Sequence, residues 1–289
     1  CAFVVKENSK HPFLEVKDHS VSGENFQLIE NLEYGFLETT PQPSLVSLPN
    51  YYKSEDYISH TDSKRNLFEI VYHLVRKISL KQKLKLINAS ISTQKNLLDV
   101  GCGTGDFLRV AKQNHWSVSG IEPNKQARQI ANNKTDNSVF EIEHLLKFQA
   151  ESFDVISLWH VLEHLPNLEE HIQVFKKLLK PNGTLIIAVP NYKSYDAEYY
   201  QEFWAAYDVP RHLWHFNKDS ISKLVSKVSM EVVKTKPLYF DAFYVSLLSE
   251  KYKNGKMNFF KGMWMGMLSN LKSIKSKEAS SLIYSIKNS

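Results

Sequence analysis

The chain has 289 residues, with 43% hydrophobic and 23% charged side chains, which excludes a wholly disordered chain and a collagen-like repeat. Its two cysteines, Cys1 and Cys102, are too few for a disulfide framework or a four-cysteine zinc site. The formal net charge is +5, but residues 251–289 hold eight lysines against one acid, Glu278. The rest of the chain therefore carries a net charge of −2, so a nucleic-acid interface would depend on the tail alone.

Neither a membrane span nor an export signal is recognisable in the sequence. No stretch approaches the roughly 18 uninterrupted apolar residues that a membrane-spanning helix needs. No basic segment followed by an apolar one opens the chain, as a signal peptide would. Together with the few cysteines, this favours a reducing cytoplasm as the location.

The first 60 residues are poorly periodic and hold four of the ten prolines. Within them, Phe26–Ile29 and Phe36–Thr39 alternate in polarity and are expected to pair as strands around the turn Asn31–Gly35. Apolar side chains at three- and four-residue spacing then predict an amphipathic helix over residues 63–88.

From Asn96 onward, apolar runs alternate with amphipathic segments, which predicts an α/β fold with a doubly wound, mostly parallel sheet. Strands are expected at Asn96–Val100, Val118–Ile121, Val139–Ile142, Phe153–Leu158, Thr184–Val189, Glu231–Lys236 and Ser281–Ile286. Helices are expected at Asp106–Asn114, Lys125–Asn133, Leu168–Leu179 and Asp219–Ser229. The breaker cluster Pro181–Gly183 is expected to separate the third of these helices from the next strand.

Residues 237–280 are too many for a hairpin turn and predict a helical insertion before the last strand. Its helices are expected around Ala242–Lys253 and Phe259–Ile274. The insertion holds four of the five methionines, and its lysines alternate with apolar and aromatic residues. Such a surface suits a packed cap, an apolar substrate or a membrane, so residues 251–277 are a candidate for peripheral membrane contact.

A glycine cluster follows the first strand of the sheet. Three of the ten glycines fall within Gly101–Gly105, between a predicted strand and a predicted helix, where the backbone can approach a ligand closely. Glu122 lies 21 residues beyond Gly101, at the end of the next strand, where an acid can accept both hydroxyls of a ribose. The sequence therefore predicts a nucleoside-containing ligand at the carboxyl ends of these strands.

The spacing of the glycines indicates which kind of nucleoside-containing ligand binds. The dinucleotide fingerprint is Gly-x-Gly-x-x-Gly, whereas this chain has Gly-x-Gly-x-Gly and then Asp106. An acid at the start of the helix would repel a pyrophosphate, and Asp99 before the glycines adds a second negative charge. These acids suit a ligand with a cationic amine, such as S-adenosylmethionine, and disfavour an oxidoreductase.

Four segments resemble the successive motifs of class I S-adenosylmethionine-dependent methyltransferases: Leu97–Phe107, Gly120–Pro123, Phe153–Val155 and His160–Pro166. A further segment, Asp208–Phe216, is similar to a motif in bacterial relatives of the ubiquinone and menaquinone methyltransferases. The resemblance covers about residues 63–289. It implies a Rossmann-like seven-stranded sheet whose last strand is antiparallel.

The family pattern also implies a set of residues that bind the methyl donor. They are Asp99, Gly101, Cys102, Gly103, Gly105, Glu122, Pro123 and Trp159. Within this set, the methionine part of the donor is implied to lie on Gly101 and Gly103, and the ribose on Glu122. Pro123 and the residues around Trp159 are implied to flank the adenosine.

The leader resembles a zinc ribbon that has lost its ligands. In some relatives two cysteine pairs bind the metal, and here the second pair would fall near Asn31 and Tyr34. Neither residue is a cysteine, so a thiolate zinc site is excluded. We expect residues 1–60 to be a metal-free, ribbon-like N-terminal extension and residues 61–289 to be the methyltransferase domain.

Transfer to a hydroxyl or an acidic carbon needs a general base, for which histidine is suited near neutral pH. His160 follows the fourth strand, and His212 and His215 follow the fifth, so these three are the catalytic candidates. The alternative is that they only shape the pocket or form structural hydrogen bonds. Some quinone O-methyltransferases bind a divalent metal in the region of His160, but Glu163 and His164 are adjacent and should point in different directions, so no metal site is predicted.

The acceptor site is predicted between residues 191–216, which are rich in aromatic side chains, and the insertion 237–280. The leading interpretation is a methyltransferase that acts on oxygen or carbon of a small, lipophilic or aromatic molecule. A catalytically silent S-adenosylmethionine-binding partner subunit is the alternative from another class. A protein or nucleic-acid methyltransferase also stays open, although the tail lysines alternate with apolar residues instead of forming a solvated basic block.

Overall fold

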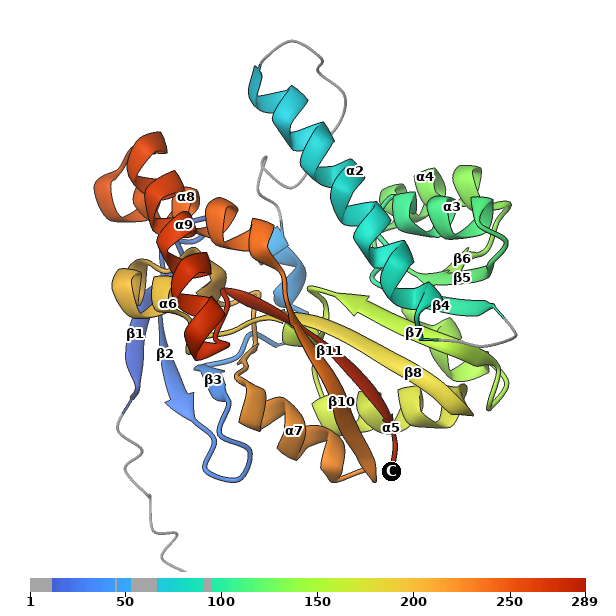
Figure 1. The fold of residues 1–289 in the computed structure, drawn as a ribbon. Helices are drawn as coiled ribbons and strands as arrows, with labels where there is room; N and C mark the ends of the chain where they lie inside the picture. The colour runs from blue at the N-terminus through green and yellow to red at the C-terminus, as the bar shows by residue number, and fades with distance from the viewer. Residues whose placement is uncertain (1–11, 45, 53–66, 91–94) are drawn as a thin grey trace, which may run out of the picture.

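The computed structural model describes residues 12–44, 46–52, 67–90 and 95–289. Much of this chain forms a seven-stranded sheet with the strand order β10-β11-β8-β7-β4-β5-β6 (Figure 1). Its strands are β4 Asn96–Val100, β5 Ser117–Ile121, β6 Val139–Phe140, β7 Phe153–Trp159, β8 Leu179–Pro190, β10 Met230–Pro237 and β11 Ser281–Asn288. Strands β4 to β8 run parallel, and β11 lies antiparallel between β8 and β10. The predicted sheet, including its antiparallel last strand, is confirmed.

Strand β8 begins earlier than the sequence predicts. The breaker cluster Pro181–Gly183 is expected to precede the strand, but β8 already starts at Leu179. Leu179 pairs with Phe153 and Thr184 pairs with Val155, so the four residues between them bulge out of the ladder. The expected break is therefore wrong, because the sheet absorbs these residues as a bulge within one strand.

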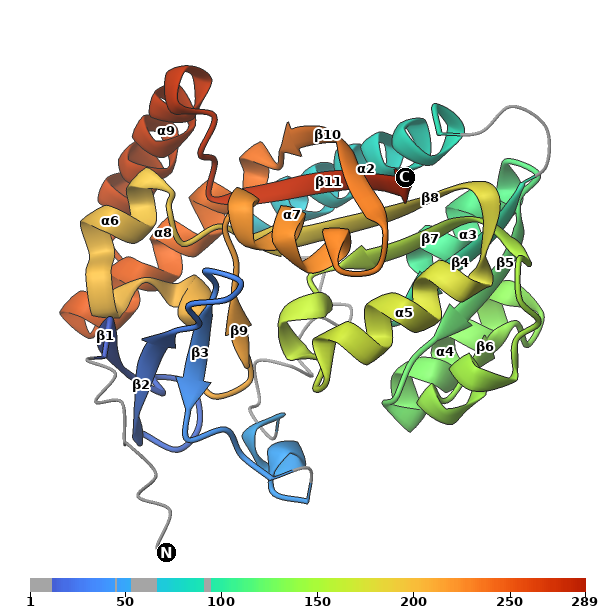
Figure 2. The ribbon, with the colours of Figure 1, turned by 90° about the horizontal axis from the view of Figure 1, so that it is seen from below.

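Helices cover both faces of the sheet. On one face lie α2 Leu67–Asn88, α3 Asp106–Gln113 and α4 Lys125–Thr135, and on the other lie α5 Leu168–Leu178 and α7 Lys218–Ser226 (Figure 2). Successive strand residues supply the two cores, since Leu97 packs with the first set of helices and Leu98 with the second. Burial on both faces explains why β8 is apolar without interruption over Leu185–Val189.

A second, antiparallel sheet has the strand order β1-β2-β3-β9. Its strands are β1 Leu14–Lys17, β2 Asn25–Glu30, β3 Leu37–Thr40 and β9 Trp214–His215. The expected pairing of the two N-terminal runs is confirmed, with Leu28 opposite Thr39. Because β9 comes from the segment after β8, this sheet is not built by the first 60 residues alone. The predicted domain boundary falls within residues 53–66, which lie outside the described part of the chain.

Two turns of this N-terminal sheet are closed by side-chain oxygens. Asp18 accepts three backbone N–H groups from the residues that follow it, at 2.8 to 3.1 Å. Asn31 Oδ1 accepts the N–H groups of Glu33 and Tyr34, each at 3.0 Å. Turns of this kind hold a tight loop through hydrogen bonds of an Asx side chain. The second of these turns occurs where the resemblance would place the second cysteine pair, at Asn31 and Tyr34.

The predicted helical insertion consists of α8 Tyr239–Asn254 and α9 Phe259–Ser276, beside the short helix α6 Tyr195–Tyr200. These helices and the N-terminal sheet enclose a core that includes Tyr192, Tyr200, Trp204 and Tyr207. The four aromatic side chains are only 1–6% exposed. The sequence predicts that the aromatic side chains of residues 191–216 line an acceptor site. In the structure these four side chains instead pack between the insertion and the N-terminal sheet.

Several connections are short 3-10 helices, at Leu48–Tyr52, Ile142–Lys147, Leu162–His164, Gln201–Phe203 and Ala205–Tyr207. The third of these, η3 Leu162–His164, follows β7 directly and positions side chains that are discussed below. Among the described residues, no helix combines the length and the apolar character that crossing a membrane requires.

Candidate functional site

The glycine-rich loop connects β4 to α3. Gly101, Gly103 and Gly105 have positive φ angles of 70°, 54° and 75°. A Cβ at Gly101 would lie 2.4 Å from Cγ2 of Val161, so a side chain is excluded there by packing as well as by conformation. A Cβ at Gly103 would meet no described atom within 4 Å. The middle of the loop therefore borders open space in which a ligand can approach the backbone.

Glu122 ends β5 beside this loop and is 5% exposed. Its Oε2 accepts the N–H of Gly103 at 2.8 Å, and its Oε1 accepts the N–H of Asn124 at 2.9 Å. Burial raises the pKa of Glu122, while these backbone hydrogen bonds oppose the rise. Each oxygen keeps a second lone pair, so the carboxylate is able to accept ribose hydroxyls while it holds the loop.

Asp99 lies on β4 just before the glycines and is 2% exposed. Ser157 of β7 donates a hydrogen bond from its Oγ to Oδ1 of Asp99, at 2.6 Å. Burial raises the pKa of Asp99 to about 6, although Ser157 and Lys83 oppose the rise. A buried carboxylate that is ionised at neutral pH makes the edge of the sheet under the loop attractive to cations.

The ammonium group of Lys83, on α2, lies at this edge of the sheet, and the sequence does not single this residue out. Its Nζ lies 4.4 Å from the ring centroid of Trp159 and 5.7 Å from that of Phe107. Burial lowers the pKa of Lys83, while Asp99 and Asp241 act in the opposite direction. In the sequence, Lys83 is one of several basic residues on a predicted amphipathic helix, and nothing distinguishes it from the lysines beside it.

Trp159 is the last residue of β7. Its indole ring lies edge-on to Phe107, with ring centroids 5.8 Å apart. Its Nε1 is buried and has no hydrogen-bond partner within the part of the chain that the structure describes. An unpaired buried donor is costly, so this N–H is available to a ligand that supplies an acceptor.

Three other residues near the loop refine the sequence prediction. The Sγ of Cys102 lies 2.8 Å from the position that a Cβ of Gly120 would take, so the thiol packs against β5. Burial raises the pKa of this thiol, which stays neutral. Asp106 forms ion pairs with Arg76 and Lys134, so its charge at the start of α3 is compensated, contrary to the sequence expectation. Pro123 is exposed.

His160 follows β7 and adopts a positive φ of 56°, which is uncommon for a residue with a side chain. Its Nε2 lies 2.8 Å from Oδ2 of Asp241, and its Nδ1 lies 3.3 Å from Oε1 of Glu163. Burial lowers the pKa of His160, but the Asp241 and Glu163 carboxylates outweigh it and raise the pKa to about 10. In this arrangement the imidazole is protonated at neutral pH. Backbone strain of this kind clusters at functional sites.

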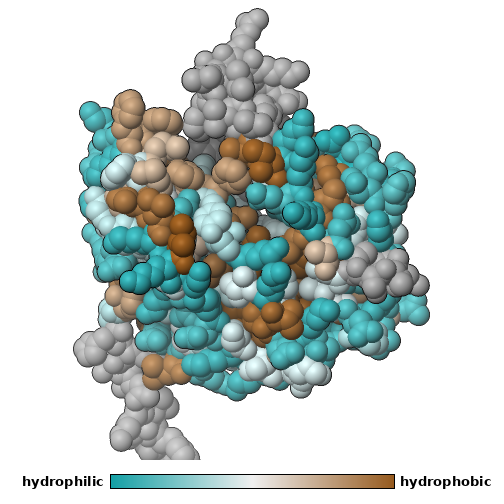
Figure 3. All heavy atoms as spheres, viewed as in Figure 1, coloured by the Kyte–Doolittle hydropathy of each residue, from teal (hydrophilic) through white to brown (hydrophobic). Residues whose placement is uncertain are grey.

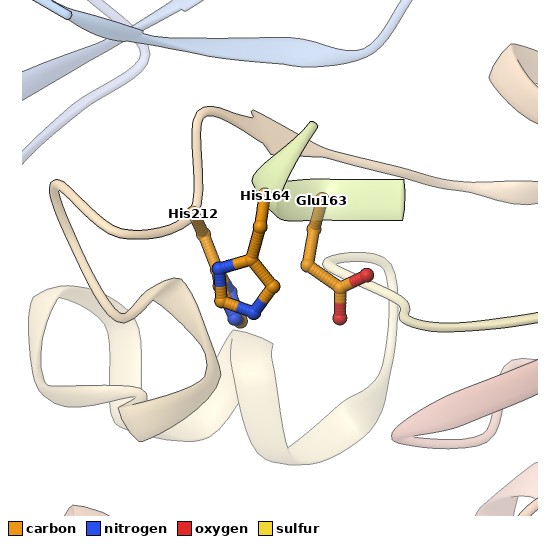
Figure 4. Close-up of side chains that lie close together, drawn as sticks. All are labelled: Glu163, His164 and His212. Atoms are coloured by element: carbon orange, nitrogen blue, oxygen red, sulfur yellow. The ribbon is translucent and has the colours of Figure 1, made fainter. Parts of the chain in front are cut away.

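Glu163 also belongs to a compact cluster with His164 and His212, shown in Figure 4. One potential ligand atom from each lies within 4.8 Å of the others. The expectation that Glu163 and His164 point in different directions is wrong, because both lie on the tight 3-10 turn η3. The backbone N–H of Leu213 donates to the carbonyl of Glu163 at 2.8 Å, which brings His212 beside this turn.

The histidines of this cluster are oriented by backbone carbonyls. Nδ1 of His164 lies 3.0 Å from the carbonyl oxygen of Arg211, and Nδ1 of His212 lies 2.9 Å from that of Ala206. A carbonyl only accepts hydrogen bonds, so each Nδ1 carries a proton, and Nε2 is the ring atom that can serve as a metal ligand. This is the arrangement in which histidine binds a metal, and Glu163 adds a carboxylate.

His212 and His215 are both buried, 8% and 4% exposed. Burial lowers the pKa of His212 well below its ordinary value and that of His215 to about 3, so both rings are neutral. His215 lies in the N-terminal sheet, where its Nε2 is 3.0 Å from Oγ1 of Thr39. Of the three candidate catalytic histidines, only His160 lies directly at the end of a strand that borders the glycine loop.

The site lies within a stretch that matches a known family. Residues 69–235, more than half of the chain, match the model of a family described as a methyltransferase domain. The ubiquinone biosynthesis O-methyltransferase of Coxiella burnetii is 28% identical over 132 residues, which are 43% of this chain and 55% of that protein. The protein of that name from Histophilus somni is 36% identical over 110 residues, 34% of this chain and 46% of that protein. The chain thus spans about half the length of these curated relatives.

Solved structures share the fold at low sequence identity. The magnesium protoporphyrin IX methyltransferase of Synechocystis PCC 6803, solved with bound S-adenosylhomocysteine, has a TM-score of 0.55 and 13% identity, and the match covers 85% of this chain and all of that one (100%). An S-adenosylmethionine-dependent methyltransferase from Archaeoglobus fulgidus has a TM-score of 0.51 and 16% identity, with 77% of this chain and 100% of that one covered.

The buried carboxylate of Asp99 predicts a pH-dependent stability. Its pKa is raised from 3.8 to about 6 on folding, so the folded state holds the proton more tightly than the unfolded state does. The contribution of Asp99 to the free energy of unfolding should therefore fall as the pH rises from about 4 to about 6, by as much as about 3 kcal/mol. His212 and His215 contribute in the opposite direction over this range, because their pKa values are lowered on folding. The test is therefore a comparison: in urea denaturation from pH 4 to pH 8, the wild type should lose stability relative to Asp99→Asn as the pH rises.

The matched control for Asp99 is Asp136→Asn, since the Asp136 side chain is 85% exposed. This variant should keep the pH dependence of the wild type. Equal slopes in all three proteins would contradict the assignment of the pH dependence to Asp99.

The prediction that no metal binds can be tested at this cluster of potential ligands. We expect the cluster of Glu163, His164 and His212 to stay empty, because His160 already compensates the charge of the Glu163 carboxylate and holds its pKa below the ordinary value despite burial. Metal analysis of purified protein should find no stoichiometric zinc, manganese or magnesium. One equivalent that is lost in His212→Ala would contradict this expectation.

Proposed function

The chain belongs to the methyltransferase-domain family, and we propose that it transfers the methyl group of S-adenosylmethionine to a small acceptor of apolar or aromatic character. The observation that carries the donor assignment is the Glu122 carboxylate, which is buried at the end of β5 and hydrogen-bonded to the backbone of Gly103 and Asn124. This geometry leaves an acceptor for ribose hydroxyls beside a loop that is open to a ligand.

The charges beside the loop suit the amino-acid end of the donor. Asp99 supplies a buried negative charge, and Lys83 supplies a cation that interacts with it electrostatically. A zwitterion with an ammonium and a carboxylate complements such a pair. The indole of Trp159, whose face attracts the Lys83 ammonium and whose N–H is unpaired, is suited to a cationic sulfonium or to the adenosine.

The proposed acceptor is quinone-like, and the transfer is to oxygen. Support comes from the relatives named above as ubiquinone biosynthesis O-methyltransferases. It also comes from the helical insertion, since Asp241 at the start of α8 contacts His160 at the strand end. The insertion thus forms one wall of the region that the donor methyl must face, and it is rich in apolar side chains.

We assign the general base to His160, positioned by Glu163. Glu163 is 1% exposed and faces Nδ1 of His160, which leaves Nε2 as the atom that can take a proton. In the present arrangement Asp241 occupies Nε2 and keeps the ring protonated. When Asp241 leaves Nε2, the ring loses a carboxylate that raises its pKa and releases its Nε2 proton to solvent. The neutral imidazole then accepts the proton of an acceptor hydroxyl while the hydroxyl oxygen bonds to the donor methyl, the bond from that methyl to sulfur breaks, and neutral S-adenosylhomocysteine leaves.

His212 and His215 are assigned supporting roles. Both are buried and neutral, and Thr39 contacts His215 at its Nε2. A residue that is enclosed in this way orders the segment before β9 instead of touching the acceptor. The alternative of a silent donor-binding subunit predicts donor binding without transfer to any acceptor, and the variants below separate it from an enzyme.

Replacing Glu122 tests the donor site. Glu122→Ala should weaken the binding of S-adenosylhomocysteine by about 1–3 kcal/mol, because the ribose and the N–H groups of Gly103 and Asn124 lose their acceptor. Isothermal titration calorimetry measures this loss. Glu143→Ala, at an exposed acid close in sequence, is the control and should bind like the wild type. Unchanged affinity in Glu122→Ala would show that the ribose lies elsewhere.

Replacing His160 tests the chemistry. His160→Gln should lower kcat by about 10²–10⁴-fold towards a phenol or catechol acceptor, because the proton acceptor is removed. Its affinity for S-adenosylhomocysteine should stay within about twofold of the wild type, a difference of less than 0.5 kcal/mol. His115→Asn, at an exposed histidine, serves as the control. Wild-type kcat in His160→Gln would exclude His160 as the base.

A further inference from the structure

The buried face of α9 consists mainly of small side chains, whereas several large apolar side chains of the helix are exposed. Its buried face includes Gly262, Gly266, Ser269 and Ser273. A Cβ at Gly266 would lie 2.7 Å from Cα of Phe243, so α9 approaches α8 closely because these residues are small. Met265 lies on the same face and enters the core, whereas the large apolar side chains on the opposite face of α9 stay outside it.

The opposite face of α9 carries an apolar stripe. Phe260, Trp264, Met267, Leu271 and Ile274 recur at spacings of four and three residues, so they lie along one side of the helix. Their exposed fractions are 86%, 56%, 37%, 54% and 59%. Figure 3 shows apolar side chains gathered along the insertion on this side of the molecule. The stripe extends for roughly 20 Å at 1.5 Å per residue.

Two residues at the start of α9 and just before it extend this apolar surface. Met257 and Phe259 are 46% and 51% exposed. Apolar surface that is contiguous and exposed over such a length marks a site of interaction. We name the set from Met257 to Ile274 the α9 stripe.

The segment that carries the α9 stripe is basic, and the first acid after it, Glu278, is paired with Lys218 at 2.6 Å. Residues 251–277 hold seven lysines and no aspartate or glutamate. Lys261 pairs with the buried Glu250, at 3.2 Å, and Lys272 lies over the ring of Tyr195, so these two belong to the packing of the insertion. Lys251, Lys256, Lys275 and Lys277 are exposed beside the stripe or at its ends.

We propose that the α9 stripe docks in the plane of an anionic membrane surface. The apolar side chains enter the boundary between headgroups and acyl chains, Trp264 lies at the interface, and the lysines contact anionic headgroups. A second copy of the chain is a poorer occupant, because two such stripes facing each other would oppose lysines to lysines with no acid in between. The combination of apolar and basic groups therefore favours a lipid surface.

This docking places the bilayer against the same helical pair that borders the site. Asp241 of α8 contacts His160, and α9 packs along α8. An apolar acceptor dissolved in the bilayer would then have a short path to the region between α8 and the strand ends. The docking itself does not depend on methyl transfer, so its test uses no activity readout.

The test is co-sedimentation of the full chain with vesicles of phosphatidylcholine alone and of phosphatidylcholine mixed with phosphatidylglycerol. We expect binding to the anionic vesicles that weakens as salt is added, together with a blue shift of the tryptophan fluorescence from Trp264. The triple variant Phe260→Gln, Trp264→Gln, Leu271→Gln should bind the anionic vesicles at least tenfold more weakly. Its thermal unfolding should match that of the wild type, since the three side chains are exposed.

Two further variants control the result. Leu146→Gln removes an apolar side chain that is 75% exposed on another helix and should leave vesicle binding unchanged. Lys275→Glu combined with Lys277→Glu should weaken binding to the anionic vesicles at low salt. Absence of vesicle binding, or wild-type binding by the triple variant, would overturn the proposal. So would a wild-type dimer in analytical ultracentrifugation that the triple variant converts to monomers, since the second copy would then be the occupant.

Discussion

The site depends on one carboxylate that joins the ends of two strands. Parallel β4 and β5 end at the same edge of the sheet, and Glu122 of β5 accepts the backbone N–H of Gly103 in the loop after β4. This hydrogen bond holds the loop in its left-handed turns, and the packing of Gly101 against Val161 fixes its other side. The open space beside Gly103 exists because both constraints act on backbone and leave that point uncovered.

Buried and half-buried charges of alternating sign occupy the rest of this edge. Asp99 and Lys83 interact beneath the loop, and His160 lies between the carboxylates of Asp241 and Glu163. The five charges come from four parts of the chain, so the network links α2, β4, the turn after β7 and the insertion. Charges that are removed from water persist only when they compensate one another, and a ligand that enters must take over some of these contacts.

The sequence allowed the large sheet, the glycine loop and Glu122 to be predicted, because strand periodicity and loop spacing are local signals. Strand β9 has two residues, too few to show any periodicity, and its partner β3 is distant in the chain. Lys83 and Asp241 resemble ordinary surface residues of amphipathic helices until the fold brings them to the strand ends. The aromatic run around Trp204 was predictable as apolar, but composition does not distinguish a pocket from a core.

The most direct test of this account is a crystal structure of the chain with S-adenosylhomocysteine. The account predicts the ribose hydroxyls within hydrogen-bond distance of the Glu122 carboxylate, the amino-acid end beside Gly101 and Gly103, and the sulfur facing the space between His160 and α8. A ribose held by other residues, or a sulfur that faces away from His160, would contradict it.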